Sequence, residues 1–145
     1  MKQTILKTAL FSAFAMAITG AAAVGAGEYL GEYCWRADAS DGSTREMKVG
    51  VSDMGGGHYL FSGTWGEPGS PHPLHGNAEV IDGSVRFTMN WGYTTDTHLQ
   101  YRHGIMILDG MLNGTVRAIK TKVEKSTGLE SIGKFKMPIT FVSCE

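Results

Sequence analysis

The sequence predicts an all-β protein, a single eight-stranded antiparallel up-and-down β-barrel closed by a disulfide between its first and last strands. From Glu28 onward, short stretches alternate apolar and polar residues with a period of two, and no segment keeps an apolar period of 3.6 residues. Clusters of Gly, Asp, Ser and Pro separate the stretches. No connection is long enough for a crossover helix, so each strand should pair antiparallel with the next.

Residues 1–26 have the order of a cleavable secretory signal. Lys2 and Lys7 come first, an apolar run covers residues 9–18, and small residues fill 20–26, so cleavage after Ala23 or Ala26 fits equally well. The apolar run is shorter than the roughly 20 residues of a permanent membrane helix. We therefore expect residues 27–145 to form one mature domain, periplasmic or secreted, with no membrane span after processing.

The charge of the mature domain excludes some partners. Loss of the two signal lysines leaves 11 basic against 14 acidic residues, a formal charge of −3, which does not suit nucleic acid. The chain has two cysteines, Cys34 and Cys144, which in an exported protein are most simply one disulfide; a metal or catalytic thiol pair is the alternative.

Seven breaks divide the mature chain into eight strands. They cover residues 38–43, 53–57, 66–73, 82–83, 94–97, 109–110 and 126–133. We predict that Asp82-Gly83 and Asp109-Gly110 are two-residue hairpin turns, because Asp-Gly readily supplies the positive φ angles that such turns require.

The two Asp-Gly turns predict which residues face inward. Pairing of Val80 with Val85 places Phe87, Met89, Trp91 and Tyr93 in the core. Pairing of Ile107 with Leu112 places inward the set Tyr101, His103, Ile105, Ile107, Leu112, Gly114, Val116 and Ala118. In the remaining strands the same alternation selects Tyr33, Trp35, Met47, Val49, Val51, Tyr59, Phe61, Trp65, Met137, Ile139 and Phe141.

The cysteines support closure of the sheet. Both fall on the outward parity of the first and last strands, which run in opposite directions in an eight-strand meander. A bond between them makes those strands neighbours, as in a barrel without free edges. A sandwich whose edges are joined by the disulfide is the competing architecture.

The pattern resembles the avidin and lipocalin group of up-and-down barrels, the calycins. The similar pieces are the third-strand segment LFSGTW at 60–65, the fifth-strand segment VRFTMNW at 85–91 and GKFK at 133–136. The resemblance implies a scaffold that holds a ligand or a partner. No Asn and Ser pair follows the first Trp to receive a biotin ureido group, so no biotin site is carried over.

The chain is also similar in build to the periplasmic lysozyme inhibitors. The residues that carry this likeness are Tyr33-Cys34 and the near-terminal Cys144. The Ser-Ala-Ser-Gly type of loop found in that family is missing here. This likeness implies an alternative function, a protein-interaction module that inhibits an exported hydrolase by inserting a loop such as 66–73.

The leading functional hypothesis is non-enzymatic binding of a small, partly apolar molecule in an aromatic barrel mouth. With the first strand taken as running upward, the residues expected near the upper mouth are Trp35, Trp65, Trp91, Tyr93, Tyr101 and His103. The alternative is an aromatic plug that merely fills the interior. The sequence has no nucleophile elbow, no phosphate loop and no free thiol in the expected oxidised pair, so it gives little support for catalysis, and no cofactor is predicted. His72 and His75 are weak metal-ligand candidates in a proline-rich segment that is otherwise a rigid surface loop.

An outward apolar run predicts self-association. Met106, Leu108, Met111 and Ile119 have outward parity on the sixth and seventh strands, where a solvated wall usually carries polar residues. Pairing of two barrel walls into a homodimer is the simplest cover. A strand bulge, or the segment 126–133 folding back, is the alternative.

Overall fold

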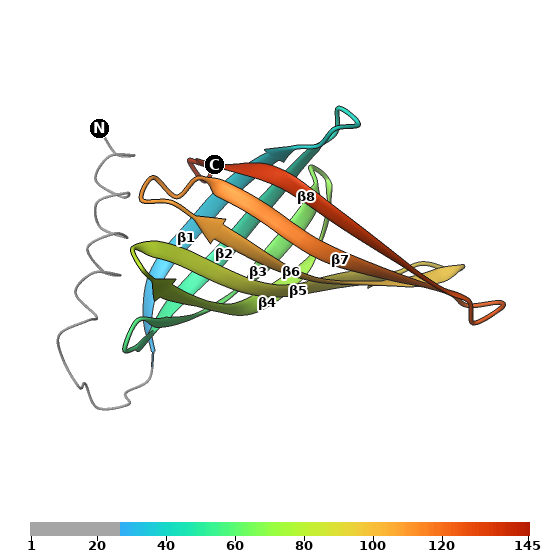
Figure 1. The fold of residues 1–145 in the computed structure, drawn as a ribbon, viewed down its shortest axis with the longest axis horizontal. Helices are drawn as coiled ribbons and strands as arrows, with labels where there is room; N and C mark the ends of the chain where they lie inside the picture. The colour runs from blue at the N-terminus through green and yellow to red at the C-terminus, as the bar shows by residue number, and fades with distance from the viewer. Residues whose placement is uncertain (1–26) are drawn as a thin grey trace.

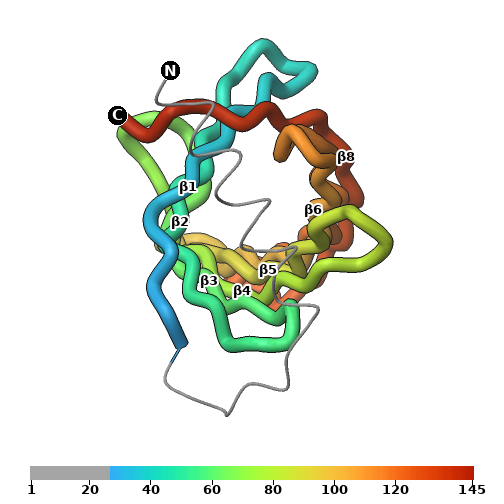
Figure 2. Tube along the Cα trace, turned by 90° about the vertical axis from the view of Figure 1, so that its left-hand side faces the viewer, coloured from blue at the N-terminus to red at the C-terminus, as the bar shows by residue number. Residues whose placement is uncertain are grey.

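A computed structural model describes residues 27–145, so the predicted signal peptide lies outside the described residues. Eight antiparallel strands make up the sheet, each hydrogen-bonded to the next and the last to the first. In chain order they are β1 (Glu28–Asp38), β2 (Thr44–Gly55), β3 (His58–Glu67), β4 (Ser70–Ile81), β5 (Ser84–Thr94), β6 (His98–Leu108), β7 (Gly114–Glu124) and β8 (Glu130–Val142). The predicted all-β class and strand number are therefore confirmed. Figure 1 shows the tilted strands, and Figure 2 looks along the closed ring that they form.

The ring closes at a short seam between β1 and β8. Pairing at the seam joins Cys34 to Val142, Trp35 to Phe141 and Arg36 to Thr140. The predicted disulfide between Cys34 and Cys144 is present, with the two Cα atoms 5.2 Å apart. The disulfide therefore links β1 to the residues that directly follow β8. Such a bond also indicates an oxidising environment, as expected of an exported protein.

Large side chains fill the interior of the ring. Trp35 lies edge-on to Phe87 and Phe141, with ring centroids 5.7 and 5.6 Å away, and Phe61 lies 4.9 Å from Phe87. All belong to one buried core cluster, to which β1 to β8 all contribute. Among residues 27–145, no helix is long and apolar enough to span a bilayer.

Of the two predicted Asp-Gly turns, one is correct and one is wrong. Asp82 and Gly83 both have positive φ, and Val80 pairs with Val85 as predicted. The second connection is instead a five-residue loop, residues 109–113. The Asp109 carboxylate accepts hydrogen bonds from the backbone N–H groups of Met111 and Asn113, and Leu112 takes a φ of 61°.

This longer loop inverts the predicted facing of β6. Ile107 pairs with Thr115 rather than with Leu112, and this change of register exchanges the two faces of β6. Met106 and Leu108, predicted to face outward, are 0 % exposed. Their place outside is taken by the residues predicted inward, namely Tyr101, His103, Ile105 and Ile107. The β7 prediction holds, because Val116 and Ala118 are buried.

The segment 66–73 is also much tighter than predicted. Glu67 pairs with Ser70, so the turn between β3 and β4 consists of Pro68 and Gly69 alone, and Gly69 has a φ of 84°. The predicted 126–133 break likewise shortens, since β8 begins at Glu130.

Candidate functional site at the upper end of the ring

We call upper the end of the ring formed by the connections 39–43, 68–69, 95–97 and 125–129. The tips of the β5–β6 and β7–β8 hairpins extend furthest at this end (Figure 1). Two prolines of β4 explain why its pairing with β5 stops short of this end. Pro71 and Pro73 pair with β3, but pairing of β4 with β5 begins only at Leu74 opposite Trp91. Because proline has no N–H to donate, the hydrogen-bonded ladder between β4 and β5 does not extend over Pro71 and Pro73.

A cavity of about 480 Å³ lies at this end of the ring, lined by residues of β2 to β6. We call it the mouth pocket; it is lined by Arg45, Gly66, Glu67, Ser70, His72, Tyr93, Thr94, Thr95 and Arg102. Its volume falls within the usual range for small-molecule sites. It combines charged side chains, hydroxyl groups and one tyrosine ring.

Aromatic rings connect the mouth pocket to the filled core below. His72 stacks on Tyr93 with ring centroids 4.1 Å apart and ring planes 19° apart. Below this pair, Trp91 lies between Trp65 at 6.0 Å and Phe135 at 6.1 Å. Trp91 is 2 % exposed, and its indole Nε1 has no hydrogen-bond partner among residues 27–145. A buried N–H donor without an acceptor is unusual and costly.

Arg102 is the central cation of the site. Its guanidinium carbon lies 5.9 Å from the Phe135 ring centre and 6.0 Å from that of Tyr93, distances at which a cation is attracted to a ring face. One terminal nitrogen donates to Gln100 at 3.2 Å, whereas the buried Nε has no partner in the described chain. Burial lowers the pKa of Arg102; Tyr93 opposes this, and the nearby Arg45 charge adds a smaller lowering.

Positive charge exceeds negative charge around the mouth pocket. Arg45 pairs with Glu67 at 2.6 Å, but none of the ion pairs within residues 27–145 includes Arg102. On β7, Lys120 is the cross-strand partner of Arg102 and Lys122 that of Gln100, so both lysines extend the inner face toward the hairpin tips. The site can therefore accept an anionic group that approaches the free side of Arg102.

The charges around His72 give a testable titration. Burial, and after it the Arg102 cation, lowers the pKa of His72, whereas Glu67 raises it. Arg102→Met should therefore raise the pKa of His72, and Glu67→Gln should lower it further. NMR titration of the His72 ring protons measures both variants. Shifts of the same sign in the two variants would contradict this arrangement of charges.

The structure brings together only half of the six predicted mouth residues. Trp65, Trp91 and Tyr93 lie at or just below the mouth pocket. Trp35 does not, because the stagger between β1 and β8 places it beside Phe141, near the end of β8. Its Nε1–H donates to the Leu112 carbonyl at 2.8 Å, in the loop at the opposite end.

Tyr101 and His103 were also predicted in the mouth and instead lie on the outer surface of β6. Tyr101 is 51 % exposed. The Tyr101 hydroxyl donates to the Asn90 side-chain oxygen at 2.7 Å, and a His103 ring nitrogen lies 2.8 Å from the same oxygen. The physical reason is the register that the 109–113 loop imposes. The incorrect register also assigned Arg102 to the outer face of β6, so it was not predicted as a mouth residue.

His72 and His75 do not share a site. His72 lines the mouth pocket, but His75 follows at an odd spacing on the same strand and is exposed on the opposite face. Within residues 27–145 no cluster of three potential metal ligands is found.

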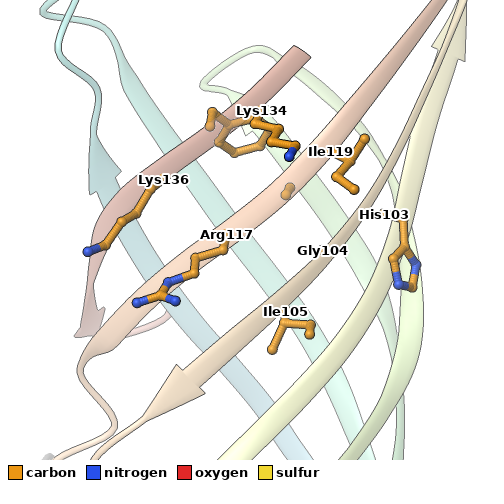
Figure 3. A pocket seen from close by; sticks show the side chains of 9 residues that line it. His103, Gly104, Ile105, Arg117, Ile119, Lys134 and Lys136 are labelled. Carbon is orange, nitrogen blue, oxygen red and sulfur yellow. The ribbon is translucent and has the colours of Figure 1, made fainter. Parts of the chain in front are cut away.

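A second concavity lies on the outer wall of β6, β7 and β8. This wall groove, of about 470 Å³, runs between two rows of outward side chains: His103, Ile119 and Lys134, then Ile105, Arg117 and Lys136. Figure 3 shows the two rows crossing the three strands, with Gly104 between them. Gly104, Ala118 and Phe135, which pair across the strands, form its floor.

The wall groove changes the predicted interface. Of the four residues predicted to form the homodimer interface, Met106 and Leu108 belong to the core, whereas Met111 and Ile119 are 56 % and 45 % exposed. The outward aliphatic residues of β6 are instead Leu99, Ile105 and Ile107.

Comparison with known proteins adds no assignment to this geometry: no protein-family model matches the chain, and no curated protein or solved structure matches it either.

Proposed function

We propose that the protein is an exported, non-enzymatic β-barrel that binds a small organic anion with an apolar or aromatic part in the mouth pocket. The avidin-like and lipocalin-like resemblance fits this proposal at the level of fold. The observation that carries it is Arg102, a partly buried guanidinium between Phe135 and Tyr93 that has no carboxylate partner among residues 27–145.

Two of the three buried donors that lack an acceptor within residues 27–145 lie at this site and support the same ligand class; the third is Arg86 Nε. Trp91 Nε1 and Arg102 Nε are buried without acceptors in the described chain. Trp91 and Arg102 are cross-strand partners, and both lie about 6 Å from Phe135. A ligand that supplies acceptor oxygens here would remove the cost of leaving these donors unpaired, and its apolar part would contact the aromatic rings.

The alternative, inhibition of an exported hydrolase, receives less support. It requires a loop that can enter a target, and the sequence offers the segment 66–73 as that loop. In the folded chain most of this segment is paired strand of β3 and β4, and only Pro68-Gly69 form the turn between them, so it offers little that could be inserted.

The ligand class can be tested with 2-naphthoate and its neutral analogue 2-naphthamide, using calorimetry. We expect the carboxylate to bind the wild-type protein, the amide to bind at least tenfold more weakly, and Arg102→Met to remove this preference. Arg36→Met is the matched control, because Arg36 is an exposed arginine on β1. Equal binding of both compounds, or loss of binding in the Arg36 variant, would contradict the proposal.

The natural ligand can be sought separately by native mass spectrometry of protein purified from the periplasm. The proposal predicts a co-purifying small anion that Trp65→Ala or Trp91→Ala releases. Retention of every co-purifying molecule by both variants would show that these molecules do not bind at the mouth pocket.

A further inference from the structure

We propose that the wall groove is a second binding site, independent of the mouth pocket, for a single-chain anionic amphiphile. Its alkyl chain would lie along the groove floor between the two rows of side chains. Its carboxylate, sulfate or phosphate head would contact the cations Arg117, Lys134 and Lys136 at one side (Figure 3).

The floor of the groove favours an alkyl chain. Gly104 pairs with Ala118, and Ala118 with Phe135, so the backbone beneath the groove lies within the continuous β6–β7–β8 ladder. β6 and β7 are paired on both sides and β8 is paired with β7 along the groove, whereas the other side of β8 pairs with β1 only at residues 140–142. The groove floor lies over the face of these strands, where their backbone groups are not available to another chain. A peptide laid here would bury amide groups without partners, whereas an alkyl chain has none to satisfy. Ile105 and Ile119 provide apolar walls.

The rim of the groove favours a negative head group. No ion pair within residues 27–145 includes Arg117, Lys134 or Lys136. The positions that surround the two rows on the same face are also free of carboxylates: Thr88, Asn90, Thr115, Thr121, Ile132 and Pro138. An anion at the rim would therefore meet cations without a competing acid.

The same charges disfavour the homodimer predicted for this wall. A two-fold interface brings the same patch of both copies together, so Arg117 and its neighbouring lysines would face one another. Like charges opposed across an interface are unfavourable. A small amphiphile carries the complementary charge and fits between rows that lie two residues apart along each strand.

The test uses fluorescence of cis-parinarate, a carboxylate with a long unsaturated chain, on the mature protein. We expect saturable binding, displacement by dodecanoate, and no comparable displacement by dodecylamine, whose head group is positive. The double variant Arg117→Glu/Lys136→Glu and the variant Ile119→Asn should each weaken binding about tenfold or more.

Three controls separate the wall groove from other sites. Lys125→Glu places a reversed charge in the exposed β7–β8 turn, and Leu60→Asn replaces an outward side chain of β3 that is 50 % exposed; neither should change the affinity. Arg102→Met should also bind cis-parinarate normally, because the mouth pocket is not involved. Thermal melts check that every variant is folded.

Several outcomes would overturn the proposal. These are equal displacement by dodecylamine, loss of binding in Arg102→Met with normal binding in the double variant, and binding to phosphatidylglycerol vesicles without binding to monomeric cis-parinarate. A wild-type dimer that Ile119→Asn dissociates would likewise assign the groove to a second copy of the chain. None of these outcomes would contradict the proposal that the mouth pocket binds an organic anion. Loss of cis-parinarate binding in Arg102→Met alone would support an anion site there.

Discussion

Removing the disulfide by Cys34→Ala/Cys144→Ala is expected to lower the free energy of unfolding by about 4–5 kcal/mol. The bond joins residues 110 apart in sequence, and a cross-link around a loop of that length strongly restricts the unfolded chain. It also spans the shortest seam of the ring, where β1 and β8 share only three paired positions. For a domain of this size the melting temperature should fall on the order of 15 °C.

Thermal and urea unfolding of the double variant measure this effect. Reduction of the wild-type protein should reproduce most of it, whereas the same reductant should not change the melting temperature of the double variant. A loss of less than about 1 kcal/mol would mean that the seam holds without the bond.

Replacing Trp35 is expected to have a comparable effect, for a different reason. Trp35 is 1 % exposed and packs against Phe87 and Phe141, so Trp35→Ala should cost about 3–5 kcal/mol through the lost contacts and the cavity left behind. Its Nε1–H also donates to the Leu112 carbonyl. Trp35→Phe should therefore remain costly even though an aromatic ring is kept.

Trp91→Phe is the matched control for the loss of the hydrogen bond from Trp35. Both tryptophans are at most 2 % exposed, but the Trp91 Nε1–H has no acceptor within residues 27–145. Its replacement removes an unsatisfied donor, so it should destabilise the free protein less than Trp35→Phe does. Urea unfolding of the two variants provides the comparison; the reverse order would contradict the hydrogen-bond assignment.

Predictions from the sequence succeeded where local patterns determine the structure. Alternation with a period of two placed Trp65, Phe87 and Ile139 inside, because one face of every strand must be buried. Asp82-Gly83 gave the correct register for β4 and β5, because a two-residue turn leaves no freedom in pairing. The same parity argument correctly paired Cys34 with Cys144.

The prediction failed where one turn controlled many side chains. Asp109-Gly110 has the same two letters as the first turn, but the Asp109 carboxylate caps a longer loop through Met111 and Asn113. That difference exchanged the inward and outward faces of β6. It placed Tyr101 and His103 on the surface, and it placed Arg102, which was not among the predicted mouth residues, inside. The stagger of β1 against β8, which displaced Trp35, has no signal in either strand alone.

The sequence by itself determined the all-β class, the number of strands and the disulfide, because alternation and cysteine parity are properties of the chain read locally. Only the tertiary structure decided which face of β6 meets the core and where the pairing of β4 with β5 stops. Those features depend on hydrogen bonds in the 109–113 loop, on the stagger of strands around the ring and on the loss of pairing beside Pro71 and Pro73. The two candidate sites follow from these choices, because the mouth pocket and the wall groove each combine residues that become neighbours only when the strands pair.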